Sequence, residues 1–119
     1  MASHNDLGKF GEELAANYLV KKGYKIHEFN WRCKKAEIDI IASLEDTLAI
    51  FEVKTRTTTS FGNPQDFVTP KKIKLLTAAA HEYVIQKNLY LEVRFDIIAV
   101  IFSKNKPEIE HLENAFLHF

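Results

Sequence analysis

The sequence predicts an α/β protein in which helices cover both faces of a mixed β-sheet, as a three-layer α/β/α sandwich. Two segments carry apolar residues at helical spacing, and several short apolar runs are typical of strands. A tight turn between two runs requires an antiparallel pair, whereas a helix between two others favours a parallel crossover. The expected order is α-β-β-β-α-β-β, and the 119 residues form a single domain, 1–119.

The first helix is expected over residues 7–19. Asn5 or Asp6 is expected to cap its start, and residues 21–23 (Lys-Lys-Gly) are typical of a helix end. Apolar residues recur along it at spacings of three and four: Leu7, Phe10, Leu14, Ala15, Tyr18 and Leu19. Three strands are expected to follow, over 24–30, 38–42 and 48–53, with a turn at 45–47.

The second half begins with a polar segment, residues 55–65, which is expected to form a loop. Thr69 is expected to cap a second helix that has Pro70 at its first position. A long apolar run at 93–102 predicts a central strand. After a turn at 104–107, residues 109–112 are expected to form a short edge strand.

Two charged triplets lie inside apolar runs of the second and third strands, residues 37–39 (Glu-Ile-Asp) and 52–54 (Glu-Val-Lys). Because successive side chains of a strand point to opposite faces, the two charged side chains of each triplet are expected to share a face. Strands with apolar residues on both faces are usually buried, and a charge buried there must be paired or bind an ion. The triplets therefore indicate a site.

Metal-assisted cleavage of a phosphodiester is the chemistry that fits these residue types. Mg²⁺, and Mn²⁺ in the same role, prefers carboxylate, water and phosphate oxygens. Asp39 and Glu52 are expected to supply carboxylates, and the Val53 carbonyl a third oxygen. Lys54 follows Glu52 by about 7 Å on the same face, where its ammonium would orient water or neutralise charge on the phosphate. The alternative is a pair of salt bridges on a solvated strand face.

The composition is that of an ordinary globular protein with no net charge. Lys and Arg nevertheless outnumber Asp and Glu between residues 21 and 74, which favours a local basic surface around the predicted site. Cys33 is the single cysteine, so an internal disulfide is excluded. The histidines lack ligand spacing, and we expect neither a signal peptide nor a membrane span, which makes the cytoplasm the expected location.

Further motifs extend over nearly the whole chain: Gly8-x-x-Gly11-Glu12 with Ala15 and Tyr18-Leu19, Asn30-x-Arg32, Glu37-Ile38-Asp39, Glu52-Val53-Lys54-Thr55-Arg56, Phe61-Gly62, Pro64 and Arg94-Phe95-Asp96. This ordered set resembles the PD-(D/E)XK nuclease superfamily. More narrowly, it resembles the bacterial YraN-type family of predicted endonucleases, which is related in fold to archaeal Holliday junction resolvases. Two departures are Ala36, where the family usually has glycine, and the missing proline before Asp39.

The resemblance implies a restriction-endonuclease-like fold and a catalytic set of four residues: Glu12, Asp39, Glu52 and Lys54. Glu12 lies at the edge of the first helix's apolar stripe, where a side chain leaning towards the sheet and a solvated glutamate are alternative interpretations. Gly8 and Gly11 beside it are small enough to let a phosphate or another backbone approach.

Two arginines are candidates for holding phosphates by bidentate hydrogen bonds, Arg32 and Arg56. Their alternative is pairing with Glu37 or with Asp96. Because Asp96 sits in the most apolar strand, we interpret it as buried and structurally paired.

Three lysines crowd the first turns of the second helix: Lys71, Lys72 and Lys74. The helix dipole disfavours cations there by roughly 0.3–1 kcal/mol each. Lysines kept in such a place are candidates for contacts to a nucleic-acid backbone, and a solvated helix end is the alternative.

These expectations define a metal-dependent nuclease acting on nucleic acid, with DNA, including branched DNA, the favoured substrate. The first alternative is a catalytically silent module of the same fold that binds nucleic acid or a protein. The second is a small α/β binding module whose carboxylates form structural salt bridges only. A homodimer is expected if both strands of a duplex are cut.

Overall fold

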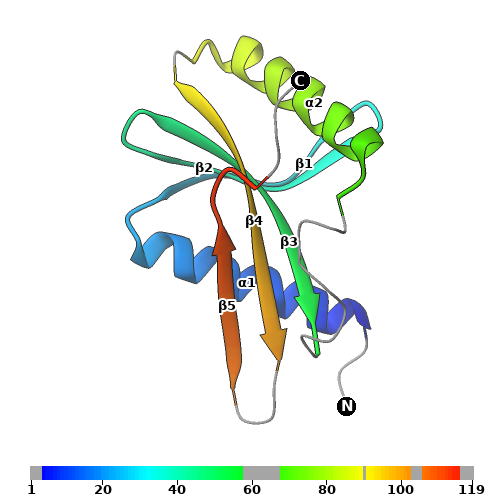
Figure 1. Cartoon of the computed structure of the whole chain (residues 1–119). Coiled ribbons are helices and arrows are strands. Elements are labelled where there is room, and N and C mark those ends of the chain that lie inside the picture. The colour runs from blue at the N-terminus through cyan, green and yellow to red at the C-terminus, as the bar shows by residue number, and fades with distance from the viewer. Residues whose placement is uncertain (1–3, 58–67, 90, 103–105, 116–119) are drawn as a thin grey trace.

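The computed structural model describes residues 4–57, 68–89, 91–102 and 106–115. The chain order of its elements matches the predicted α-β-β-β-α-β-β, and their bounds are α1 His4–Lys21, β1 Lys25–Cys33, β2 Ala36–Leu44, β3 Thr47–Arg56, α2 Pro70–Lys87, β4 Glu92–Phe102 and β5 Pro107–Leu112 (Figure 1). The predicted residues 61, 62 and 64, like most of the predicted 55–65 loop, lie outside the described residues.

One mixed sheet forms the centre of the molecule, with its five strands in the order β1-β2-β3-β4-β5. Three neighbouring pairs are antiparallel, and β3 and β4 are parallel over a long register from Thr47–Glu92 to Arg56–Ile101. The expected mixture is therefore confirmed. It arises because α2 returns the chain to the same end of the sheet, whereas short turns join β1 to β2 and β2 to β3.

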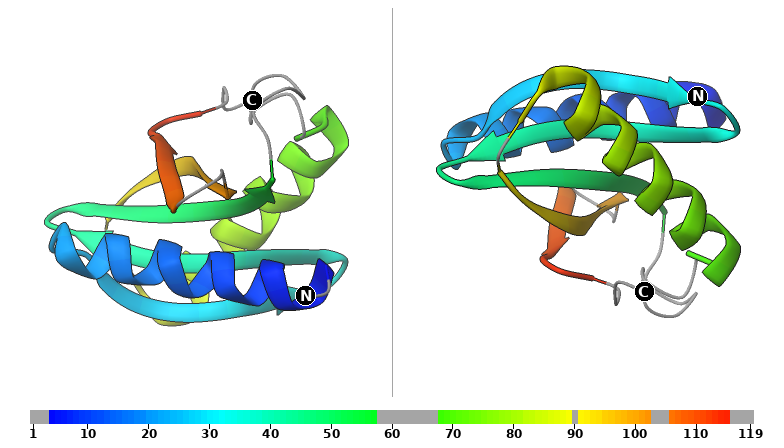
Figure 2. Two further views of the ribbon diagram at one scale, coloured as in Figure 1. Left: turned by 90° about the horizontal axis from the view of Figure 1, so that it is seen from below. Right: turned by 90° about the horizontal axis from the view of Figure 1, so that it is seen from above.

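The core consists of two clusters of buried residues, and each cluster includes residues from one of the two helices. Ala15 and Leu19 of α1 pack with Phe51 and Ile98 in one cluster, which also includes Tyr24. Leu76, Ala79, Ala80 and Tyr83 of α2 pack with Ile50 and Ile97 in the other cluster. Neighbouring strand residues such as 97 and 98 enter different clusters, so the central strands are buried on both faces, as their continuous apolar runs predict. Figure 2 shows α1 running along the hairpin of β1 and β2.

Local sequence signals set the ends of several elements. Thr69 caps α2, and its Oγ1 accepts a hydrogen bond from the Lys72 amide over 3.1 Å, as predicted. The turn between β2 and β3 lies at residues 45–46, and Glu45 has a positive φ of 54°. The predicted cap of α1 is wrong, because that helix begins at His4 and Asp6 lies in its first turn.

The hairpin of β1 and β2 carries an irregularity at the predicted site. Ile38 and Ile40 are two residues apart, yet they pack in different core clusters, so the alternation of faces is interrupted at Asp39. The residue across from Asp39 is Asn30, whose φ is 50°. Strict alternation, from which we expected Glu37 and Asp39 to share a face, therefore does not hold at this point of β2.

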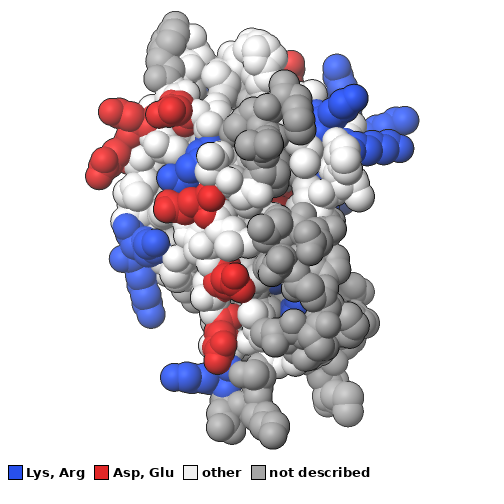
Figure 3. All heavy atoms as spheres, in the orientation of Figure 1, with Lys and Arg blue, Asp and Glu red and all other residues white. Residues whose placement is uncertain are grey.

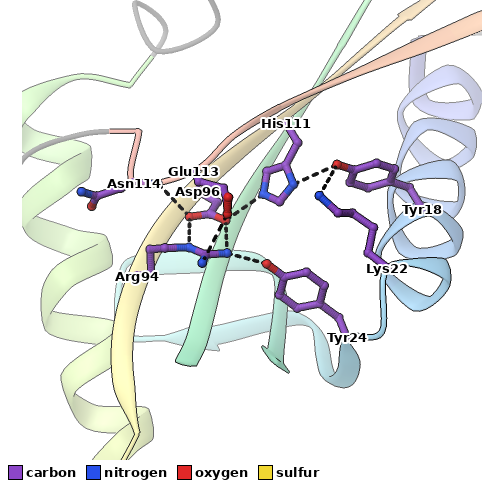
Figure 4. A network of polar contacts seen from close by, with 8 residues as sticks. All are labelled: Tyr18, Lys22, Tyr24, Arg94, Asp96, His111, Glu113 and Asn114. Atoms are coloured by element: carbon purple, nitrogen blue, oxygen red, sulfur yellow. Dashed lines mark hydrogen bonds and ion pairs between the residues drawn. The ribbon is translucent and has the colours of Figure 1, made fainter. Parts of the chain in front are cut away.

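A second polar network lies elsewhere on the sheet and ties β4 to β5 and α1 (Figure 4). Asp96 is fully buried, and its carboxylate accepts hydrogen bonds from Arg94 at 2.9 and 2.8 Å. His111 Nε2 lies 2.8 Å from Asp96 Oδ2, and the other ring nitrogen lies 3.1 Å from the Tyr18 hydroxyl. The backbone amide of Asn114 also donates to Asp96. The predicted structural pairing of Asp96 is thus confirmed.

Neither helix in the described part of the chain is long and apolar enough to cross a membrane.

Candidate active site

Glu52 is the central residue of the candidate site. It lies on β3 and is 5% exposed, and in the described residues only Asp96 is another buried charged side chain. Its Oε1 accepts a hydrogen bond from Lys72 Nζ of α2 over 2.5 Å, and Lys54 Nζ lies 3.3 Å away. The expected shared face of Glu52 and Lys54 is therefore confirmed. Two ammonium groups offset the burial of one carboxylate.

Asp39 approaches from the neighbouring strand β2. Its Oδ2 accepts a hydrogen bond from the Val53 amide over 2.8 Å, just beyond the last β2–β3 pair, Ile40–Phe51. Burial, together with the charges of Glu52 and Glu12, raises the pKa of Asp39 to about 7, although the hydrogen bond from the Val53 amide and the charge of Lys72 act to lower it. The charged form of this carboxyl is therefore disfavoured first by burial and then by the neighbouring carboxylates, a combination that is common at functional sites.

Glu12 on α1 is the third carboxylate of the site and is partly buried. Burial raises its pKa, and so do the charges of Glu37 and Glu52. With its amide nitrogen turned towards these carboxylates, Asn30 donates to Glu12 over 3.1 Å and to Glu37 over 3.2 Å. The interpretation of Glu12 as a solvated helix residue is therefore wrong, because β1 holds its side chain against the sheet.

Gly11 explains how α1 comes this close to β3. A Cβ placed on Gly11 would overlap the Oγ1 of Thr55, so only glycine permits this contact. A Cβ on Gly8 would have no atom within 4 Å among the described residues, so that glycine has no comparable packing role there. The packing of Gly11 against Thr55 positions Glu12, its immediate neighbour in the sequence.

The predicted arginines differ in their surroundings. Arg32 forms an ion pair of 3.0 Å with Glu37, and its side chain is 78% exposed, so it is accessible to a phosphate even while paired. Arg56 is partly buried, and its Nη1 donates to the Thr55 carbonyl over 3.1 Å.

The three lysines of α2 fall into two groups. Lys71 and Lys72 line a cavity of about 280 Å³ that also contains Lys35, whereas Lys74 lines a separate cavity beside His81. A third cavity, of about 460 Å³, adjoins Glu12 and Asn30. The candidate site is therefore open to solvent on its Glu12 side and on its Lys72 side.

Sequence reasoning missed two contacts of the site. In the sequence Asn30 stands out only as part of a motif, and no local pattern indicates that its side chain joins Glu12 to Glu37. Lys72 was assigned to a nucleic-acid surface, but the structure places its ammonium on Glu52. The one available signal was the crowding of cations at a helix start, where the dipole disfavours them.

The arrangement combines three carboxylates and two ammonium groups from four elements: α1, β2, β3 and α2. Within the described residues, no group of three or more His, Cys, Asp or Glu side chains is already spaced to hold a metal ion. Asp39 and Glu52 nevertheless present oxygen donors on adjacent strands. The Val53 N–H points at Asp39, and a strand residue directs its carbonyl to the same side as its N–H.

The fold and site together define an α/β protein with a partly buried cluster of carboxylates and lysines at one edge of the β2–β3 ladder. Residues 11–100 match the uncharacterised protein family UPF0102, and the chain belongs to this family. UPF0102 proteins from Flavobacterium psychrophilum and Christiangramia forsetii are 60% and 56% identical to it over 119 residues, which cover all of each chain. One from Phocaeicola vulgatus is 50% identical over 98% of this chain and 96% of its own.

Proposed function

We propose that this protein is a divalent-metal-dependent nuclease of the PD-(D/E)XK superfamily, with the restriction-endonuclease-like layering of that superfamily. Its substrate is nucleic acid, with DNA, including branched DNA, favoured. The observation that carries the proposal is the convergence of Asp39 and Glu52, where burial and the neighbouring charge raise the pKa of Asp39 to about 7. Two neighbouring carboxylates whose charged forms are disfavoured in this way fit a cation held by oxygen ligands.

The donor set fits Mg²⁺ or Mn²⁺, with Asp39, Glu52 and the Val53 carbonyl as ligands. Such an ion lowers the pKa of bound water and offsets the charge of a phosphate. The raised pKa of Asp39 means that a proton and a cation compete for this carboxylate near neutral pH.

The remaining roles belong to the chain's own side chains. Lys54 lies on the same strand face as Glu52, so its ammonium is positioned to stabilise charge that develops on the scissile phosphate. Glu12 is oriented by Asn30 and faces a cavity, where it accepts a proton or orients water. The exposed guanidinium of Arg32 is placed to hold a phosphate outside the cluster.

The proposal is tested in two stages with wild type and Asp39→Asn, purified identically. Mg²⁺ or Mn²⁺ should raise the melting temperature of the wild type, because a ligand bound only to the folded state stabilises it. Asp39→Asn should lose most of this shift. With Mn²⁺, the wild type should then cleave at least one of branched DNA, single-stranded DNA, duplex DNA and RNA, and the variant should not. Equal melting shifts in both proteins would exclude the shared metal site.

A second candidate function is a catalytically silent binding module of the same fold. The two ammonium groups on Glu52 favour it, because they already satisfy that carboxylate without a metal ion. Tight binding of nucleic acid without cleavage of any member of the panel would support this candidate over the nuclease.

A further inference from the structure

A cavity of about 280 Å³ lies between the start of α2 and the turn that joins β1 to β2. Figure 1 shows this turn next to the first residues of α2, and Figure 3 shows Lys and Arg side chains gathered at that corner. Its polar lining includes Lys35, Thr69, Lys71 and Lys72. We infer that this cavity binds one phosphate group of the nucleic-acid backbone, an inference that rests on the proposed function for its ligand.

The charge of the lining favours an anion. Three lysines from two separate elements line the cavity, and the ammonium of one of them, Lys72, is already paired with Glu52. Among the described residues, Glu37 is the one acid in the lining. That carboxylate is already engaged by Arg32 at 3.0 Å and by Asn30. Cations gathered around a hollow repel one another, and an anion between them removes the repulsion.

The size of the cavity fits a phosphate group and its waters. Sites for small molecules typically measure about 300–1,000 Å³, and this cavity lies at the lower end of that range. The lining also includes Leu75 and Leu76, and apolar walls lower the local dielectric, which strengthens charge interactions.

Lys72 links this cavity to the candidate active site. Its side chain lines the cavity, and its ammonium donates to Glu52. A backbone phosphate held by Lys35 and Lys71 would therefore lie one side chain away from the carboxylate cluster. A strand held there would place a neighbouring phosphodiester near Glu52 and Lys54, so the cavity favours a substrate with successive phosphates, as a chain of nucleotides has.

Lys74 supplies a matched control. It lies on the same helix and is exposed like Lys71, but it lines a different cavity with Thr77 and His81. Replacing Lys71 or Lys74 by Gln removes the same charge from nearly the same sequence position. Only the first change affects the proposed phosphate cavity.

The test is a double-mutant cycle on DNA binding in the presence of a chelator, so that no cleavage occurs. Lys35→Gln and Lys71→Gln should each weaken binding of labelled duplex and single-stranded DNA. Together they should weaken it by clearly less than the product of the single effects, because they hold the same phosphate. Lys35→Gln and Lys74→Gln should combine independently. In the Lys35→Gln/Lys71→Gln protein, the slope of log affinity against log salt concentration should fall by about 0.9 for duplex DNA or about 0.7 for a single strand. This is the loss expected for one phosphate contact, not two.

Independent effects of Lys35→Gln and Lys71→Gln, or unchanged affinity, would overturn the inference. A parallel titration with inorganic phosphate, followed by the amide resonances of Thr69 and Lys71, separates the sources of the ligand. Shifts with inorganic phosphate but no loss of DNA affinity in the variants would mean a site for free anions, which also overturns the inference. This binding experiment is separate from the cleavage experiment on the proposed nuclease, so the two ideas can fail independently. Coupling of Lys35 and Lys71 in a protein that cleaves nothing would reject only the nuclease. Cleavage by a protein that shows no such coupling would reject only the phosphate cavity.

Discussion

Lys72 Nζ at the start of α2 donates to Glu52 Oε1 on β3 over 2.5 Å. This contact links α2 directly to the buried carboxylate at the centre of the candidate site. An ammonium group also occupies one side of the carboxylate that we propose as a metal ligand, so a lysine and a divalent cation compete for the same oxygen atoms.

This competition predicts the behaviour of Lys72→Met. In the presence of a chelator the variant should be less stable than wild type by about 1 kcal/mol, a modest figure because the Lys72 side chain is 36% exposed. Mg²⁺ should then stabilise the variant more than it stabilises wild type, since no ammonium opposes the cation at Glu52. Urea unfolding with chelator and with Mg²⁺ measures both differences. Lys74→Met is the control, and equal Mg²⁺ effects in all three proteins would exclude the competition.

The two glycines of α1 provide a second, paired prediction. Gly8→Ala should stabilise the protein by roughly 0.5–1 kcal/mol, because alanine favours a helix and its Cβ would meet none of the described residues there. Gly11→Ala should destabilise it and weaken the metal-dependent melting shift, because the new Cβ pushes α1 away from Thr55 and carries Glu12 with it. Thermal unfolding of both variants checks the prediction. A stabilising Gly11→Ala would contradict the close packing of α1 on β3.

The Asp96 network predicts a pH-dependent loss of stability that is independent of the metal. Burial alone would raise the pKa of Asp96, but hydrogen bonds from His111, Arg94 and the Asn114 amide outweigh it and hold the pKa below the ordinary value of 3.8. A lowered pKa means that the stabilisation is complete above 3.8 and is lost as the pH falls through the lower value of the folded state.

Asp96→Asn should therefore cost about 1–3 kcal/mol at pH 7. The substitution removes the buried charge that accepts hydrogen bonds from Arg94 and His111, although Arg94 keeps an ion pair of 3.4 Å with Glu113. The difference from wild type should shrink as the pH is lowered below 3.8. Urea unfolding at a series of pH values measures this difference, and the Mg²⁺-dependent stabilisation should remain. Loss of that stabilisation in Asp96→Asn would show that the network and the candidate site are not separate.

The order of elements could be predicted because each rests on a local pattern. Apolar spacing indicated both helices, the Thr69-Pro70 pair fixed the start of α2, and the polar residues at 45–47 required a hairpin. The pairing of Asp96 followed from a charge in the most apolar strand. Such signals depend on a few neighbouring residues, and burial of the same residues then reinforces them.

The missed contacts join residues that are distant in the sequence. The hydrogen bond from Lys72 to Glu52 depends on how α2 docks on the sheet, which no local pattern specifies. At Asp39 the alternation of side chains between the two sheet faces is interrupted, opposite a left-handed Asn30 on the neighbouring strand. The simple alternation rule predicts no such interruption. The close approach at Gly11 becomes visible only when Thr55 is seen opposite it.

The central claim, that the cluster is a catalytic site, is tested most directly by single-turnover cleavage with Lys54→Met. The substitution keeps an apolar stem of similar length and removes only the charge, and Asp39 and Glu52 remain. With Mn²⁺ and saturating enzyme, on the best substrate of the wild type, we predict a rate lower by about 10²–10³-fold, with nearly unchanged affinity for DNA and an unchanged or larger metal-dependent melting shift. Cleavage at the wild-type rate by Lys54→Met, or no cleavage by wild type despite metal and DNA binding, would contradict the account.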